Sequence, residues 1–146
     1  MKYLITDDSK MARKMTIKSL EDLIKKEDEI LEASNGLEAV ELYKEHKPGI
    51  CFMDLTMPIM DGFEAIKEIK SYDKDAKIII VSADIQEFAK QKARENGAIG
   101  FINKPINKDT ISMMLNKSNS LFSKSSSIQA SVIKSYKCLV SFSDRW

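Results

Sequence analysis

The sequence predicts an α/β fold in which a five-stranded parallel sheet is covered by helices on both faces. Short apolar runs alternate with longer amphipathic segments five times along the chain, and repeated strand-then-helix units are typical of parallel sheets. Two of the runs, GICFM at 49–53 and KIIIVSA at 77–83, are almost continuously apolar. Parallel strands have this composition because the covering helices bury both of their faces.

Each apolar run is an expected strand, because such runs are short and several are rich in β-branched or aromatic residues. The strands are expected at KYLIT (2–6), EILEA (29–33), GICFM (49–53), KIIIVSA (77–83) and AIGFINKP (98–105).

A helix is expected after each strand, because apolar residues recur there at intervals of three or four. The helices are expected over about 9–25, 37–47, 63–69, 85–96 and 107–117. Ser9 can cap the first helix, Pro48 limits the second, and the pair Asn96-Gly97 is a stop signal for the fourth. The apolar face of the first helix is expected to comprise Met11, Met15, Leu20, Leu23 and Ile24.

One domain is expected over residues 1–118, followed by a tail over 119–146. Ten of the thirty residues from 117 onward are serine, and this stretch carries five basic side chains and one acidic one. Its apolar positions fit a strand and a helix equally well, so disorder, an added strand and an added helix all stay open. The origin of the tail also stays open, because it could be a natural docking segment, the stub of a longer protein, or a remnant of cloning or of a frameshift.

The composition excludes several classes of protein. The net charge of +1 argues neither for nor against a nucleic-acid partner, and direct nucleic-acid binding is not expected because no fold to support it is indicated. No apolar run approaches the ~20 residues that a membrane-spanning helix needs, and MKYLITDDSK does not resemble a signal peptide. Cys51 and Cys138 lack the spacing of a metal or redox site, and the lone His46 argues against zinc. A cytoplasmic protein with no membrane insertion is expected.

Polar side chains stand where four of the expected strands end: Asp7 and Asp8, Asp54, Ser82, and Lys104. Carboxyl ends of parallel strands share one edge of the sheet, so these groups are expected to converge. Two like charges ~4 Å apart repel by about 4 kcal/mol at an effective dielectric near 20, so three clustered carboxylates need either protonation or a cation, and Lys104 can balance one of them. An oxygen-only cluster at an open edge suits Mg²⁺ together with a phosphoryl group. The alternative for Asp8 alone is an ordinary turn or cap residue.

Four motifs identify a family. LITDDS (4–9), MDLTMPIMDG (53–62), IIIVSA (78–83) and GFINKPI (100–106) together resemble the response-regulator receiver domain of two-component signalling. The resemblance covers about residues 1–118 and is closest to stand-alone chemotaxis regulators. It implies a flavodoxin-like (βα)5 fold with the strand order 2-1-3-4-5, which is the order known for those regulators.

The resemblance implies a phosphoacceptor and a magnesium site. Asp54 corresponds to the phosphoacceptor, which takes a phosphoryl group from a histidine kinase or from a small donor such as acetyl phosphate. Asp8 and Asp54 correspond to direct ligands of Mg²⁺, Asp7 to a ligand acting through water, and Thr56 to a ligand through its backbone carbonyl.

The resemblance also implies a switch. Lys104 corresponds to the residue that pairs with a phosphoryl oxygen, and Ser82 to the one that hydrogen-bonds another after phosphorylation. Phe101 stands where the family has its switching aromatic, often a tyrosine, and it lacks the tyrosine hydroxyl. Pro105 is expected to follow a cis peptide bond.

The expected function is therefore that of a phosphorylation-dependent response regulator. Its expected partners are a histidine kinase or phosphotransfer protein and a downstream protein target, which would bind the fourth helix, fifth strand and fifth helix. A monomer or weak dimer is expected. The alternatives are an intermediate in a phosphorelay, and a receiver-fold binding module that is no longer phosphorylated.

An enzyme acting on other molecules is not expected, beyond the protein's own phosphorylation and slow dephosphorylation. Aspartyl phosphatases usually carry a second aspartate two residues after the nucleophile, where this chain has Thr56. No glycine-rich G-x-G-x-x-G or P-loop motif follows the first strand, which argues against nucleotide binding.

Overall fold

The computed structural model describes residues 1–84 and 86–122, the last six of these by their backbone alone. Expectations about the tail from residue 123 onward lie outside the described residues. Strands and helices alternate along the described part of the chain. They are β1 (Lys2–Thr6), α1 (Lys10–Glu21), β2 (Glu29–Ala33), α2 (Gly36–His46), β3 (Ile50–Met53), α3 (Gly62–Tyr72), β4 (Ile78–Ser82), α4 (Glu87–Glu95), β5 (Gly100–Asn103) and α5 (Lys108–Phe122).

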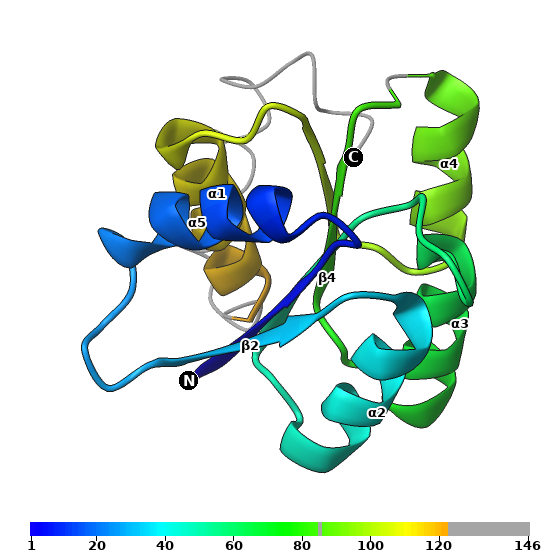
Figure 1. The fold of residues 1–146 in the computed structure, drawn as a ribbon, viewed down its shortest axis with the longest axis horizontal. Coiled ribbons are helices and arrows are strands. Elements are labelled where there is room, and N and C mark those ends of the chain that lie inside the picture. Colours follow the sequence, from blue (N-terminus) through cyan, green and yellow to red (C-terminus); the bar gives the residue numbers. More distant parts are fainter. Residues whose placement is uncertain (85, 123–146) are drawn as a thin grey trace.

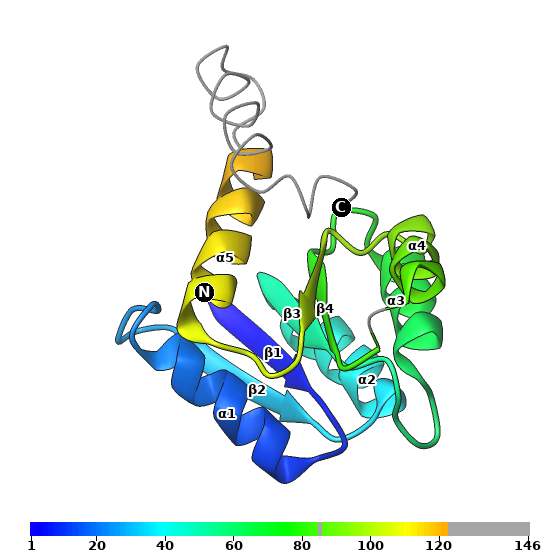
Figure 2. The same ribbon diagram turned by 90° about the horizontal axis from the view of Figure 1, so that it is seen from above.

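The five strands form one parallel sheet in the order β2-β1-β3-β4-β5, which confirms the predicted fold class. Helices α1 and α5 lie on one face of the sheet, and α2, α3 and α4 lie on the other (Figures 1 and 2). The chain moves outward from β1 to β2 and then returns to β3. The strand order therefore reverses between β1 and β3, where sheets of this kind form a crevice at their carboxyl edge.

A hydrophobic cluster on each face holds the sheet in place. The strand residues packed with α2, α3 and α4 include Leu4, Cys51, Met53, Ile78 and Ile80. Those packed with α1 and α5 include Tyr3, Ile5, Phe52, Ile79 and Val81. Alternate residues of one strand serve opposite faces, which explains the continuous apolar runs. Each fully buried aliphatic side chain contributes roughly 1.5–3 kcal/mol, so the strand ends that carry the polar residues are firmly positioned.

Helix α1 differs from the prediction in length and in orientation. It ends at Glu21 rather than at residue 25, because the N–H groups of Leu23 and Ile24 both donate to the carbonyl of Leu20 and turn the chain toward β2. The expected apolar face is wrong at its start, where Met11 is 71% exposed and Met15 47%. The buried face runs instead through Thr16 and Leu20.

The last strand and helix also have other bounds than expected. Strand β5 is shorter than the predicted run, because Ala98 still donates a backbone hydrogen bond to Ala93 at the end of α4. Helix α5 continues to Phe122, four residues past the expected end of the domain. Among residues 1–84 and 86–122, no helix is both long and apolar enough to cross a membrane.

Candidate functional site

The polar strand-end residues are fixed by backbone hydrogen bonds that continue the sheet beyond its strands. The N–H of Asp7 donates to Ala33 (3.1 Å), and that of Asp54 donates to Thr6 (2.9 Å). At the other side of the crevice, the N–H of Lys104 donates to Ser82 (2.9 Å). These bonds join the end of β1 to β2, the end of β3 to β1 and the end of β5 to β4, so the main chain stays in register up to the edge where the polar side chains begin.

Three carboxylates meet at this edge. One oxygen each of Asp7, Asp8 and Asp54 lies within 4.8 Å of the others. Asp7 and Asp54 are buried and Asp8 is exposed, so the cluster has an inner wall and an open side. Asp7 Oδ1 accepts from the N–H of Ser9 and Asp54 Oδ1 from that of Leu55, both at 2.9 Å. The set consists of hard oxygen donors alone, which fits Mg²⁺.

Lys104 supplies a positive charge beside the cluster. Its Nζ lies 2.7 Å from Asp7 Oδ2 and 3.6 Å from Asp54 Oδ2. Burial lowers the pKa of the Lys104 ammonium. The hydrogen bond to Asp7 and the charges of Asp54 and Asp7 outweigh that effect, so the pKa is raised above its ordinary value. Lys104 is therefore charged at any physiological pH.

Asp54 has an unusual protonation equilibrium. Burial raises the pKa of its carboxyl group from 3.8 to about 6, and the neighbouring charge of Asp7 adds to the rise. The charge of Lys104 and the hydrogen bond from Leu55 oppose it without cancelling it. Near neutral pH the group is mainly a carboxylate that water solvates poorly, and a carboxyl group perturbed in this way marks a candidate functional site.

Ser82 of β4 and Phe101 of β5 lie on one face of the sheet. Ser82 is 3% exposed, and its Oγ accepts from the N–H of Asp84 (3.1 Å). Phe101 pairs in register with Ile80, which stands two residues before Ser82 and therefore on the same face. The Phe101 ring is 8% exposed, and Lys90 Nζ of α4 lies 5.7 Å from its centroid.

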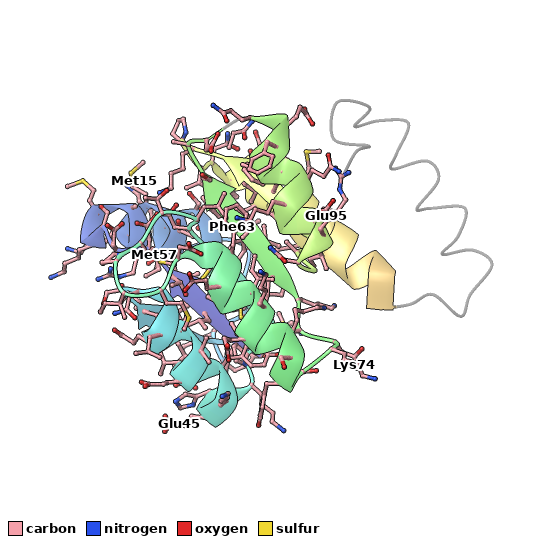
Figure 3. The ribbon with its side chains drawn as sticks, turned by 90° about the vertical axis from the view of Figure 1, so that its right-hand side faces the viewer. Met15, Glu45, Met57, Phe63, Lys74 and Glu95 are labelled. Atoms are coloured by element: carbon pink, nitrogen blue, oxygen red, sulfur yellow. The ribbon has the colours of Figure 1, made fainter. Side chains whose placement is uncertain are left out.

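Thr56 and Pro105 lie in loops at the edge of the site. Thr56 is exposed two residues after Asp54, in the loop that carries Met57 and leads to Phe63 of α3 (Figure 3). The peptide bond between Lys104 and Pro105 is cis, as the resemblance implies.

Arg13 is a site neighbour that the sequence analysis missed. Its Nη1 donates to the backbone carbonyl of Asp7 (2.6 Å), and its Nε donates to Glu32 at the end of β2 (3.0 Å). Arg13 thereby fixes the main chain from which Asp7 and Asp8 project. A basic residue in the first turn of a helix is too common to have indicated this contact.

Comparison with known proteins places these features in a family. Residues 3–116 match the family model described as the response regulator receiver domain. The chemotaxis protein CheY of Thermotoga maritima is 47% identical over 118 residues, covering 80% of this chain and 95% of that protein. The CheY of Bacillus subtilis is 45% identical over 117 residues, with the same two coverages.

Solved structures of chemotaxis proteins also resemble this chain in fold and in sequence. A crystal structure of a CheX–CheY–BeF3–Mg²⁺ complex from Borrelia burgdorferi contains a chain with 31% identity and a TM-score of 0.71, covering 84% of this chain and 89% of that one. The CheY4 structure of Vibrio cholerae has a TM-score of 0.72 at 28% identity, covering 80% of this chain and 97% of that one.

Proposed function

Because this chain belongs to the response-regulator receiver-domain family, we propose that Asp54 accepts a phosphoryl group from a histidine kinase in a magnesium-dependent reaction. The observation that carries the proposal is the convergence of three carboxylates within 4.8 Å of one another, with the ammonium of Lys104 2.7 Å from Asp7 and 3.6 Å from Asp54. This arrangement provides a nucleophile, a cation and oxygen ligands at one open edge.

The chemistry follows from these groups. An oxygen of Asp54 attacks the phosphorus of a phosphohistidine, and the P–N bond breaks with its electron pair passing to the imidazole nitrogen. Phosphoryl transfer depends mainly on positioning and charge neutralisation. Asp8, Asp54 and the carbonyl of Thr56 would hold Mg²⁺ directly and Asp7 through water, and the ion would supply positive charge to the phosphoryl oxygens. Lys104 provides a further positive charge beside Asp54.

Phosphorylation then acts as a local charge switch. It adds roughly −1.5 to −2 charge and strong acceptor oxygens beside Ser82. Ser82 turns from Asp84 toward these oxygens, and Phe101 adjusts on the same face of the sheet. The result is a changed surface on α4, β5 and α5 for a downstream protein.

The protein catalyses only its own phosphorylation and the slow loss of the phosphoryl group to water.

The test is the intact mass of the chain after incubation with acetyl phosphate and Mg²⁺. We expect one adduct of about 80 Da, the mass of one HPO3 group on a single carboxylate. The adduct should be absent in EDTA and in Asp54→Asn.

A matched control is Asp75→Asn, which removes an exposed carboxylate outside the cluster. This variant should be labelled like the wild type. Labelling of Asp54→Asn at an unaltered rate would show that the acceptor is another residue. Labelling in EDTA at an unaltered rate would exclude the magnesium requirement.

A further inference from the structure

A groove opens at the amino edge of the sheet, on the face that α1 and α5 cover (Figure 2). Its volume is about 450 Å³, within the range usual for binding pockets. Helix α5 lines it with Ser112, Leu115 and Asn116, and the segment between α1 and β2 lines it from another side. Tyr3 and Ile50, at the starts of β1 and β3, also line it. The length of a strand, roughly 16 Å for five residues, therefore separates the groove from the carboxylate cluster.

Part of the groove lining is apolar. Tyr3 and Ile50 are 5% and 2% exposed and belong to the hydrophobic cluster on this face. Leu23 and Leu115 are only partly buried and pack against that cluster. Covering such apolar surface yields roughly 25 cal/mol for each Å² that is removed from water. A segment with apolar side chains would therefore be stabilised in this groove.

The charge near the groove is negative. Residues 21–29 carry five carboxylates and two lysines, a net charge of −3, whereas the rest of residues 1–116 has sixteen acidic and sixteen basic side chains. Two of the five carboxylates line the groove: Asp28 pairs with the N-terminal ammonium at 2.9 Å, and Glu27 is exposed. Residues 123–146 carry four basic side chains and one acidic one, a net charge of +3. The two segments are thus complementary in charge.

Helix α5 leads the chain to the groove. It runs from Lys108, just after the carboxyl edge, to Phe122, over roughly 22 Å at 1.5 Å per residue. Phe122 stands six residues, or about 9 Å, beyond the last groove residue of the helix, Asn116. The 24 residues that follow can extend over as much as ~80 Å, so the groove is within their reach. Their apolar residues include Ile128, Val132, Tyr136, Val140 and Phe142.

We propose that residues 123–146 dock in this groove of the same chain, with apolar side chains on Leu23 and Leu115 and basic side chains beside Glu27. A segment of this length is too short to bury its apolar residues in a core of its own. The covalent link also favours docking, because it raises the local concentration of the segment to the millimolar range. The docked segment leaves Asp54 accessible, since groove and carboxylate cluster lie at opposite edges of the sheet.

Two other arrangements compete with this one. The basic segment could bind the acidic cluster at the carboxyl edge, or it could bind the groove of a second copy of the chain. The observations favour the groove of the same chain, because α5 carries the chain away from the carboxyl edge and because Lys104 already balances part of the charge of the cluster.

The experiment places a nitroxide spin label on Cys138 of the full chain. Cys51 is fully buried and its thiol pKa is raised by burial, so it does not react. The label weakens the NMR signals of nearby amide groups. We expect residues 23–28 and 112–116 to lose about half of their signal or more, since a linked segment is mostly docked. Residues 57–64, at the carboxyl edge, should change little. Signal loss centred on the carboxyl edge, or spread evenly over the surface, overturns the proposal.

A mixed sample tests the second copy. Chains with ¹⁵N and Cys138→Ser are mixed with spin-labelled chains that lack ¹⁵N, so that only contacts between chains weaken the signals. No loss is expected at residues 23–28. A loss as large as that within one labelled chain overturns docking in the same chain.

Charge reversal tests the attraction. The double variant Glu21→Lys/Glu27→Lys reverses two exposed carboxylates of residues 21–29, and we expect the signal loss at the groove to fall about twofold or more, since several weak ion pairs act together. The matched control is Glu41→Lys/Glu68→Lys, which makes the same change of net charge at exposed positions of α2 and α3, on the other face. Equal effects of the two variants would overturn the role of the groove carboxylates.

This inference is independent of the proposed function, and the failures are distinguishable. Glu21→Lys/Glu27→Lys should form the same adduct with acetyl phosphate as the wild type. If the wild type forms no adduct but the label marks the groove, the proposed function fails and the docking stands. If the adduct forms on Asp54 and the label does not mark the groove, only the docking is wrong.

Discussion

A Cβ atom on Gly62 would overlap the backbone carbonyl oxygen of Asp54 and would lie 2.8 Å from Cα of Leu55. The first residue of α3 therefore packs directly against the main chain of the candidate phosphoacceptor. The N–H of Gly62 also donates to the carbonyl of Leu55 (2.9 Å), so the helix start and the strand end form one unit.

The substitution Gly62→Ala should consequently lower the free energy of unfolding by about 1–3 kcal/mol, because backbone atoms must move to admit the methyl group. Urea denaturation measures this loss. Gly49→Ala is the control, since its Cβ would overlap the Met1 side chain, which is flexible and half exposed, and would lie at an ordinary contact distance of 3.7 Å from the carbonyl oxygen of Lys2. Equal losses for the two variants would contradict the special role of the Gly62 contact.

Asp54→Asn should stabilise the protein in a pH-dependent way. The pKa of Asp54 is raised from 3.8 to about 6 in the folded chain, so its charged form is less favourable there than in the unfolded chain. Ionisation of Asp54 therefore lowers the free energy of unfolding of the wild type by up to about 3 kcal/mol as the pH rises from about 4 to 6. In EDTA, Asp54→Asn should be more stable than the wild type by up to this amount at pH 8, and the difference should shrink below pH 4. Urea denaturation at pH 4, 6 and 8 checks the sign, and a constant difference across this range would refute it.

Ile59 stores backbone strain in the loop after Asp54. Its φ is +69°, a conformation unfavourable for a β-branched residue, and its side chain is 76% exposed. The N–H of Met60 closes the tight turn by donating to Pro58 (2.7 Å), and Met60 O accepts from Gly36 (3.0 Å). Ile59→Asn should raise the free energy of unfolding by about 1 kcal/mol, because asparagine tolerates positive φ.

Ile59→Val provides the comparison, because it keeps the β-branch and therefore the strain. Its midpoint in urea should equal that of the wild type. If the asparagine and valine variants unfold at the same urea concentration, the loop is not strained at this residue.

The sequence could predict the strands and which residues end them, because buried parallel strands are continuously apolar and polar residues interrupt them only at the edge. Asp7, Asp54 and Lys104 could be grouped on that basis alone. The conformations of the loops and the buried faces of the helices were harder to predict from the sequence. Met11 and Met15 look like core residues by spacing and are exposed, and Ile59 gives no signal of its positive φ.

The detailed pairing within the site was also beyond sequence reasoning. That Lys104 bonds Asp7 more closely than Asp54, and that Arg13 binds the carbonyl of Asp7, depends on how loops from different strands place their side chains. Differences of about 1 Å decide these contacts, and no periodicity in the sequence encodes them.

The ion pair between Asp7 and Lys104 joins residues 97 positions apart, one just after the first strand and the other just after the last. A nascent chain emerging from the ribosome therefore holds its acidic residues long before it holds their counter-charge. Until β5 has been synthesised and has joined β4, the cluster lacks this cation and Asp54 lacks its completed surroundings. The Asp7–Lys104 contact therefore forms only after β5 has joined the sheet, and the arrangement of the candidate site depends on the order in which the strands assemble.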